Sequence, residues 1–261
     1  MTTERASPEA PEAPAVSVSR IEALATRQLT PCGAGSMVWR IWGEGRPLVL
    51  LHGASGSWTH WIRNILPLAR HVRVLAPDMP GFGDSDVPPQ PHTADALADL
   101  LASGLHVVVP PPTELDIAGF SFGGIIGGLV AARLGRRVRT LVLLGAGGMA
   151  LPRAPMPPLL PIQPDMAPAE IQRVHRENLR ILMMANPDKV DDLASSCRWR
   201  TSARRASSPG LSRPPTPCCR RYQQSERASP VSGEVVTRLR LRVSETIGES
   251  SRRSRATSTS A

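Results

Sequence analysis

One serine lies in a sequence context that favours nucleophilic chemistry. Ser121 is the centre of Gly119-Phe120-Ser121-Phe122-Gly123, which matches the G-x-S-x-G pattern of a nucleophile elbow. In such a turn a strand passes sharply into a helix, and glycines two residues to either side avoid a clash with the strained backbone. The serine oxygen then lies at a helix N-terminus, where the helix dipole favours a developing negative charge. A chance glycine-rich turn is the alternative, but the strand expected before the motif and the helix expected after it favour the elbow.

A second loop of small residues supplies candidate donors for an oxyanion. His52 and Gly53 directly follow the apolar run 47–51. A tetrahedral intermediate needs N–H donors about 3 Å from its oxyanion. We expect one donor to be the amide of Phe122 and the other to be the amide of Ala54. A plain glycine-rich turn is the alternative for this loop. His52 is expected to be a structural histidine that orients the loop, and not the catalytic base.

A third motif, D-M-P-G-F-G-D-S at residues 78–85, is expected to form a tight loop. Two glycines and a proline within eight residues are typical of turns. We expect this loop to close one side of the pocket, and we assign it no catalytic role.

Alternating strands and helices must position these three motifs. Short apolar runs predict strands at residues 37–42, 47–51, 72–77, 115–119 and 140–144. Apolar residues at helical spacing predict helices at 58–68, 93–102, 125–134 and 168–185. This order indicates an α/β fold with a mostly parallel sheet and right-handed crossovers, because continuous apolar strands suit a sheet that helices cover on both faces.

Composition divides the chain of 261 residues into four segments. Residues 1–24 are expected to be a disordered leader, since they lack the apolar core of a signal peptide. Residues 25–148 form the predicted α/β core, and the proline-rich and helical segment 149–196 is expected to be a lid. Residues 197–261 form a tail rich in arginine and serine, which is expected to be disordered or out of frame.

The basic charge of the protein belongs to this tail alone. Residues 198–261 hold 14 Arg and four Glu, whereas residues 1–197 hold 17 basic and 18 acidic side chains. Nucleic acid is therefore not an expected partner of the whole protein, and the tail lacks the interleaved aromatics of a base-stacking surface. The four cysteines show neither a C-x-x-C pair nor metal-ligand spacing, so no metal is expected. The sparse cysteines favour a cytoplasmic location, and no apolar run is long enough to span a membrane.

The motifs together resemble the α/β-hydrolase superfamily over about residues 25–195. The resemblance rests on L-V-L-L-H-G-A-S-G-S-W, V-L-A-P-D-M-P-G-F-G-D-S and D-I-A-G-F-S-F-G-G. It implies an α/β-hydrolase fold with helices on both faces of an eight-stranded sheet and a small helical lid. It also implies cofactor-free hydrolysis by a triad in the chain order serine, acid, histidine, the last two following the final strands. The lid sequence I-L-M-M-A-N-P-D-K-V-D-D resembles meta-cleavage-product hydrolases and related esterases, which implies a small ester, lactone or C–C bond beside a ketone as substrate.

The sequence departs from this family where the catalytic acid and base should follow, and neither is identified. The only histidine after Ser121 is His175, which is expected to be a helix-surface or lid residue. The remaining histidines precede the elbow: His52, His60, His71, His92 and His106. The acidic residues after the elbow lie in the lid or the tail, and those of the lid are Asp165, Glu170, Glu177, Asp188, Asp191 and Asp192. A serine without a base is a weak nucleophile, so poor turnover is expected.

Three interpretations of the tail remain open. The first is translation in a shifted reading frame after about residue 195, because many Arg, Ser and Pro without Lys or Asp are typical of a GC-rich gene read out of frame. The second is a genuine basic tail on a non-catalytic, hydrolase-like binding protein. The third is an active hydrolase with an unusual base. A sheet without its last strands would carry an open apolar edge.

Overall fold

The computed structural model describes residues 14–149, 157–163, 165–184, 186 and 190–197. Most of the expected lid is included. The first 13 residues of the predicted leader and the tail from residue 198 lie outside the described residues. The expectations of a disordered or out-of-frame tail and of further strands in it therefore stay predictions.

A mixed sheet of six strands organises the described chain, in the order β1-β2-β4-β3-β5-β6. The strands are β1 (Thr26–Cys32), β2 (Gly35–Trp42), β3 (Pro47–Leu51), β4 (Arg73–Pro77), β5 (Leu115–Phe120) and β6 (Val138–Leu144). The last four pair in parallel, whereas β1 and β2 pair antiparallel with each other and β2 pairs antiparallel with β4. The predicted fold class, an α/β fold with a mostly parallel sheet, is thus confirmed.

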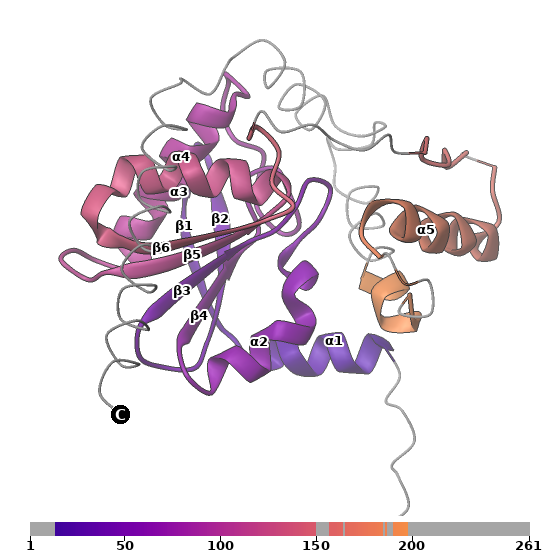
Figure 1. Cartoon of the computed structure of the whole chain (residues 1–261), viewed down its shortest axis with the longest axis horizontal. Coiled ribbons are helices and arrows are strands. Elements are labelled where there is room, and N and C mark those ends of the chain that lie inside the picture. The colour runs from indigo at the N-terminus through magenta and orange to yellow at the C-terminus, as the bar shows by residue number, and fades with distance from the viewer. Residues whose placement is uncertain (1–13, 150–156, 164, 185, 187–189, 198–261) are drawn as a thin grey trace, which may run out of the picture.

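Helices cover both faces of this sheet (Figure 1). On one side lie α3 (Ala94–Val108) and α4 (Phe122–Leu134), and on the other lie α1 (Pro14–Ala23) and α2 (Ile62–Ala69) with the short 3₁₀ helix η1 (Trp58–Trp61). A second 3₁₀ turn, η2 (Gly135–Arg137), joins α4 to β6. Helix α5 (Pro168–Leu182) lies apart from the sheet, in the segment predicted to be a lid.

The sheet separates two hydrophobic cores because successive side chains of a strand point to opposite faces. In β3, Val49 and Leu51 face the core beneath α3 and α4, whereas Leu50 faces the core beneath α1 and α2. Strand β4 repeats the pattern, with Leu75 on the first side and its two neighbours on the second. Residues buried on both faces explain why these strands read as continuous apolar runs.

Part of the predicted disordered leader is helical instead. Helix α1 begins at Pro14, and the side chain of Val18 within it is completely buried. The indole Nε1 of Trp42 donates a hydrogen bond of 2.8 Å to the carbonyl of Ile21, which fastens the helix to β2. The low-complexity composition of the leader concealed this helix, because a single buried valine, a backbone carbonyl and the ion pair of Glu22 with Arg40 attach it to the sheet.

Helix α3 runs to Val108, six residues beyond the predicted end at residue 102. Buried Leu105 and Val108 continue its apolar stripe. Gly104 lies within the added turn, where the helix packs closely on β1 and β2. A Cβ there would be 2.6 Å from Cε of Met37 and 2.9 Å from Cζ2 of Trp39, so these side chains would have to shift to accommodate it.

Strand β6 lies at an edge of the sheet. It pairs with β5 on one side, and within the described residues no strand pairs with the other. Val142 and Leu144 on this strand are 46% and 41% exposed. Among the described residues, β6 thus presents exposed apolar side chains, and the expectation of an open edge stays a prediction.

Candidate active site

Ser121 lies in the expected strand–turn–helix context. Strand β5 ends at Phe120 and α4 begins at Phe122, so that the serine is the single residue between them. Its backbone has φ 53° and ψ −115°, a conformation that side-chain-bearing residues rarely adopt and that costs about 1–3 kcal/mol. The turn is held by the Ser121 amide, which donates to the carbonyl of Leu144 on β6 at 2.8 Å. A strained serine between a strand and a helix is the geometry of a nucleophile elbow.

The two glycines of the motif are required by close backbone packing. A Cβ on Gly119 would lie 2.3 Å from the carbonyl oxygen of Gly123. A Cβ on Gly123 would lie 2.3 Å from the carbonyl oxygen of Leu51 and 2.5 Å from that of His52. The close packing at Gly123 means that the end of β3 lies directly against the start of α4. The same packing that forces the elbow therefore places the loop after β3 beside Ser121.

The loop after β3 reaches the serine through Gly53. A Cβ on Gly53 would lie 2.9 Å from the ring of Phe120 and 3.4 Å from Cβ of Ser121. The candidate donors Ala54 and Phe122 each lie within one residue of this contact. Among the residues that the structure describes, none accepts a hydrogen bond from the Ala54 amide. The joint role of these two amides as an oxyanion hole remains a prediction.

His52 connects this loop to the loop at residues 78–85. Its ring is completely buried, and Nε2 accepts a hydrogen bond of 3.0 Å from the amide of Met79. Because Nε2 is the acceptor, a neutral imidazole carries its proton on Nδ1, which lies 2.8 Å from the carbonyl oxygen of Gly53. The ring also packs edge-on against Phe82 at 5.5 Å. Both ring nitrogens are engaged with backbone groups, as suits a histidine that orients a loop.

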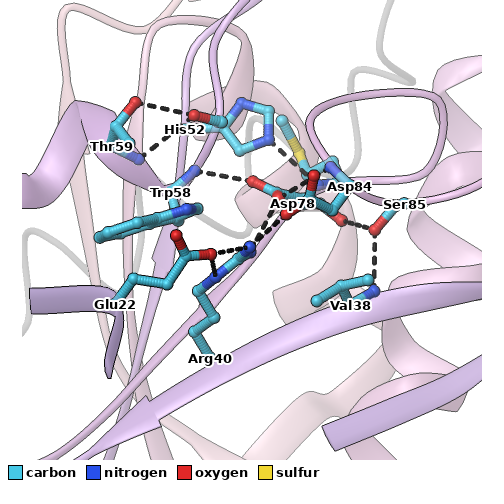
Figure 2. A network of polar contacts seen from close by, with 11 residues as sticks. Glu22, Val38, Arg40, His52, Trp58, Thr59, Asp78, Asp84 and Ser85 are labelled. Carbon is cyan, nitrogen blue, oxygen red and sulfur yellow. Dashed lines mark hydrogen bonds and ion pairs between the residues drawn. The ribbon is translucent and has the colours of Figure 1, made fainter. Parts of the chain in front are cut away.

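The loop at residues 78–85 is built around the carboxylate of Asp78, which Figure 2 shows. The Asp78 side chain is 1% exposed. Its Oδ1 accepts from the amide of Trp58 at 2.8 Å, and its Oδ2 accepts from the amide of Asp84 at 3.0 Å. Gly83 has φ +55°, and a Cβ there would lie 2.2 Å from the carboxyl carbon of Asp78. This carboxylate organises the loop and holds the start of η1.

A buried arginine cluster lies beneath that loop, and we define it as Arg40, Asp78, Asp84 and Glu22. The Arg40 side chain is 2% exposed. Its Nη1 donates to Asp78 at 2.9 Å, and its Nη2 donates both to Glu22 at 2.6 Å and to Asp84. The guanidinium also lies over the ring of Trp58, 5.2 Å from its centroid (Figure 2). Sequence reasoning missed this cluster, although a single charged residue within the apolar strand M-V-W-R-I-W is a signal for it.

No described histidine takes the position of a catalytic base. Within the part of the chain that the structure describes, the Ser121 hydroxyl makes no hydrogen bond to a histidine. His175, expected to be a helix-surface or lid residue, lies on α5 in the segment predicted to be a lid, and its side chain is 2% exposed. It follows Val174 on the inner side of α5, together with Asn178 and Leu179. A histidine beside an apolar stripe is buried when that stripe packs against neighbouring chain, which excludes only the surface alternative.

Other reactive groups in the described chain have structural roles. Burial, followed by the charge of Asp86, raises the pKa of the Cys32 thiol to about 11, so the nucleophilic thiolate is scarce at neutral pH. Burial acts to raise the pKa of Asp191, but hydrogen bonds from the Ala194 amide and from Arg63 outweigh it and lower that pKa. Asp191 is therefore ionised at neutral pH, and it fastens the segment 190–197 to α2 through Arg63.

Among the described residues, no group of three or more His, Cys, Asp or Glu side chains is arranged to hold a metal ion. Of the helices in the described ranges, none combines the length and apolar character needed to cross a lipid bilayer.

In a comparison with known protein families, residues 48–241 match the model of the "Alpha/beta hydrolase family". One relative is the 2-hydroxy-6-oxo-2,4-heptadienoate hydrolase of Pseudomonas putida, which is 40% identical over 113 residues. That match covers 41% of this chain and 40% of the relative. Another is the 2-hydroxy-6-oxo-6-(2'-aminophenyl)hexa-2,4-dienoic acid hydrolase of Metapseudomonas resinovorans, 31% identical over 60% of this chain and 53% of the relative. The chain thus spans about half, or less, of the length of these curated relatives.

A solved structure shows the same arrangement of elements. Wild-type Cfl2 from Burkholderia cenocepacia is similar with a TM-score of 0.58 and 26% sequence identity. The similarity covers 77% of this chain and 72% of Cfl2. It therefore extends beyond the segment that contains the elbow.

Proposed function

The chain belongs to the alpha/beta hydrolase family, and on that premise we propose that it is a serine hydrolase with Ser121 as nucleophile. The proposed substrate is a small molecule with an ester, a lactone or a C–C bond beside a ketone. The observation that carries the proposal is the strained backbone of Ser121 between β5 and α4. The names of the two Pseudomonas-type relatives, both hydrolases of oxo-dienoates, support a carbonyl compound as the substrate.

In the proposed reaction, Oγ of Ser121 attacks the carbonyl carbon of the substrate. The carbonyl oxygen then becomes an oxyanion, which the amides of Ala54 and Phe122 stabilise by hydrogen bonds. Each donor of this kind contributes about 10²–10³ in kcat in serine hydrolases. The serine proton must pass to a base, and no such base is assigned in this chain. Loss of the histidine in a well-studied serine protease costs about 10⁶ in kcat, so the rate depends on this missing group.

A second candidate function is binding without turnover, either as a hydrolase-like binding protein or as an inactive, frameshifted remnant. One observation favours it: no histidine in the described chain hydrogen-bonds to Ser121. A preformed elbow and neighbouring loop could still bind a carbonyl compound. Activation of the serine therefore distinguishes the two candidates.

A fluorophosphonate probe tests the activation of Ser121. We expect the full chain to be labelled at Ser121 and the Ser121→Ala variant to remain unlabelled, because the probe reacts with serine hydroxyls that a base activates. Labelling is measured by mass spectrometry of the modified peptide. Circular dichroism shows whether both proteins are folded. A folded chain that stays unlabelled would reject the enzyme and support the binding candidate.

The coding DNA tests the origin of the tail. If the tail is out of frame, another frame from about codon 190 will encode two further apolar strands, the first followed by an Asp and the second by a loop His. This expectation follows from the chain order of the family triad. Absence of such strands from both other frames would instead identify the basic tail as genuine sequence.

A further inference from the structure

We infer that His60 is a positioning residue for the proposed active site, although the sequence pattern gave it no role. The inference rests on the proposed function, because it concerns the loop that carries the candidate oxyanion donor. His60 lies on η1, seven residues after Gly53 along the chain. Its side chain connects that loop with β5, the strand that ends at Phe120 directly before Ser121.

The imidazole of His60 fixes the amide that precedes the candidate donor. The amide of Gly53 donates a hydrogen bond of 3.1 Å to Nδ1 of His60. Because Nδ1 is the acceptor, the neutral ring carries its proton on Nε2. The peptide plane after Gly53 contains the amide of Ala54. His60 thus anchors the peptide plane directly before the one that carries the Ala54 amide, and the carbonyl of that next plane lies 2.8 Å from Nδ1 of His52.

The same ring packs against the nucleophile strand. His60 and Phe120 meet edge to face, with ring centroids 5.7 Å apart and an interplanar angle of 77°. Phe120 directly precedes Ser121, and its ring also lies against Gly53. One imidazole thus contacts both the residue before the nucleophile and the residue before the candidate donor.

The surrounding chain is shaped to hold this ring. A Cβ on Gly56 would lie 2.2 Å from Cε1 of His60, so the ring occupies the space that a side chain would need. The amide of His60 donates to the carbonyl of Ser57 at 3.0 Å, and the Ser57 hydroxyl lies 2.7 Å from that of Thr59. These hydrogen bonds hold the turn that carries His60. The first and last residues of that turn, Trp58 and Trp61, are also buried.

His60 differs in this respect from His52. The ring of His52 holds the loop from the side of residues 78–85, through the amide of Met79. His60 holds it from the side of β5 and Ser121. The two rings meet edge to face, 6.1 Å apart, so that the loop backbone is supported from both directions.

Two substitutions at His60 separate hydrogen bonding from packing. His60→Leu retains bulk but removes the acceptor, whereas His60→Asn places Oδ1 where Nδ1 lies and retains the acceptor. In the full chain, we expect His60→Leu to increase hydrogen exchange of the Gly53 amide about fivefold or more, and His60→Asn to restore most of the protection. Exchange is measured by NMR on ¹⁵N-labelled protein. His106→Leu, at an exposed position on α3, is the matched control and should leave this exchange unchanged.

The rate of fluorophosphonate labelling supplies the second readout. We expect His60→Leu to slow labelling of Ser121 by about tenfold to a hundredfold, because a misplaced catalytic group costs rates of this order. The inference is overturned if Gly53 exchange is the same in His60→Leu as in the unaltered chain, or if both His60 variants raise it equally. If the unaltered chain is not labelled at all, the proposed function fails, and the exchange measurement still decides whether His60 positions the loop.

Discussion

Replacing Arg40 with methionine is expected to lower the free energy of unfolding by about 3–5 kcal/mol. Methionine fills much of the same space but carries no charge. The Asp78 carboxylate, 1% exposed, would then lack its only cationic partner in the arginine cluster. A buried charge without a partner is far more costly than the intact pair is stabilising. Urea unfolding followed by the fluorescence of the five tryptophans measures the change.

An exposed pair in the same protein gives the control for this expectation. Arg46 donates to Asp116 at 2.9 Å, but its side chain is 48% exposed. Arg46→Met should therefore cost about 1 kcal/mol or less. Equal losses in the two variants would contradict the assignment of Arg40 as a buried cluster centre.

A double variant tests whether the loss comes from the stranded carboxylate. Asn at position 78 retains an oxygen for the amide of Trp58 and removes the negative charge. We expect Arg40→Met with Asp78→Asn to be more stable than Arg40→Met alone, since the uncompensated charge is gone. This result would separate charge from the loss of packing against Trp58.

The arginine cluster also shows why part of the site is invisible in the sequence. Arg40 belongs to a strand whose residues from Met37 onward are buried. The residues next to Arg40 in the sequence do not indicate that its ionic partners are Glu22, Asp78 and Asp84. The four residues meet because β2 pairs with β4 and because α1 packs behind them. Such partners depend on the tertiary structure, which short-range periodicity does not encode.

The strands and helices around the elbow were predictable because their local sequence pattern, and not distant partners, determines them. Strand β3 is a continuous apolar run, since helices cover both its faces, and its predicted bounds match the structure. Strand β1 was missed because its sequence T-R-Q-L-T-P-C has no apolar alternation and more than half of its residues are not buried. Its stability comes from pairing with β2 along seven residues. Local hydrophobic pattern thus predicts the centre of the sheet better than its edge.

The role inferred for His60 follows the same logic. Five histidines precede Ser121 in the chain, and the sequence alone gave no means of telling His60 from those on the surface. The one available signal was glycine at position 56, whose missing Cβ makes room for the imidazole. That signal becomes readable only when the turn between Gly53 and His60 is known.

Gly119→Ala is expected to abolish the elbow and to destabilise the fold by about 3 kcal/mol or more. The added Cβ would lie 2.3 Å from the carbonyl oxygen of Gly123 and 2.6 Å from Cα of Gly124. Both are backbone atoms, so no side chain can rotate away to relieve the contact. Strand β5 and helix α4 would have to separate, and Ser121 would lose the conformation on which its proposed role as nucleophile rests. Urea unfolding measures the loss of stability, and fluorophosphonate labelling measures the loss of reactivity.

Gly127→Ala is the matched control, because it adds the same methyl group within α4 where the neighbours can yield. A Cβ there would lie 3.3 Å from Cγ2 of Ile117 and 3.5 Å from a side-chain carbon of Leu141, so that side-chain shifts of a few tenths of an ångström relieve the contact. Alanine also favours a helix over glycine by about 1 kcal/mol, which offsets the tighter packing. We expect its stability to stay within about 1 kcal/mol of the unaltered chain. If Gly119→Ala were tolerated as well as Gly127→Ala, the strained turn at Ser121 would not depend on the glycine pattern, and that pattern would no longer be a physical reason to expect a nucleophile.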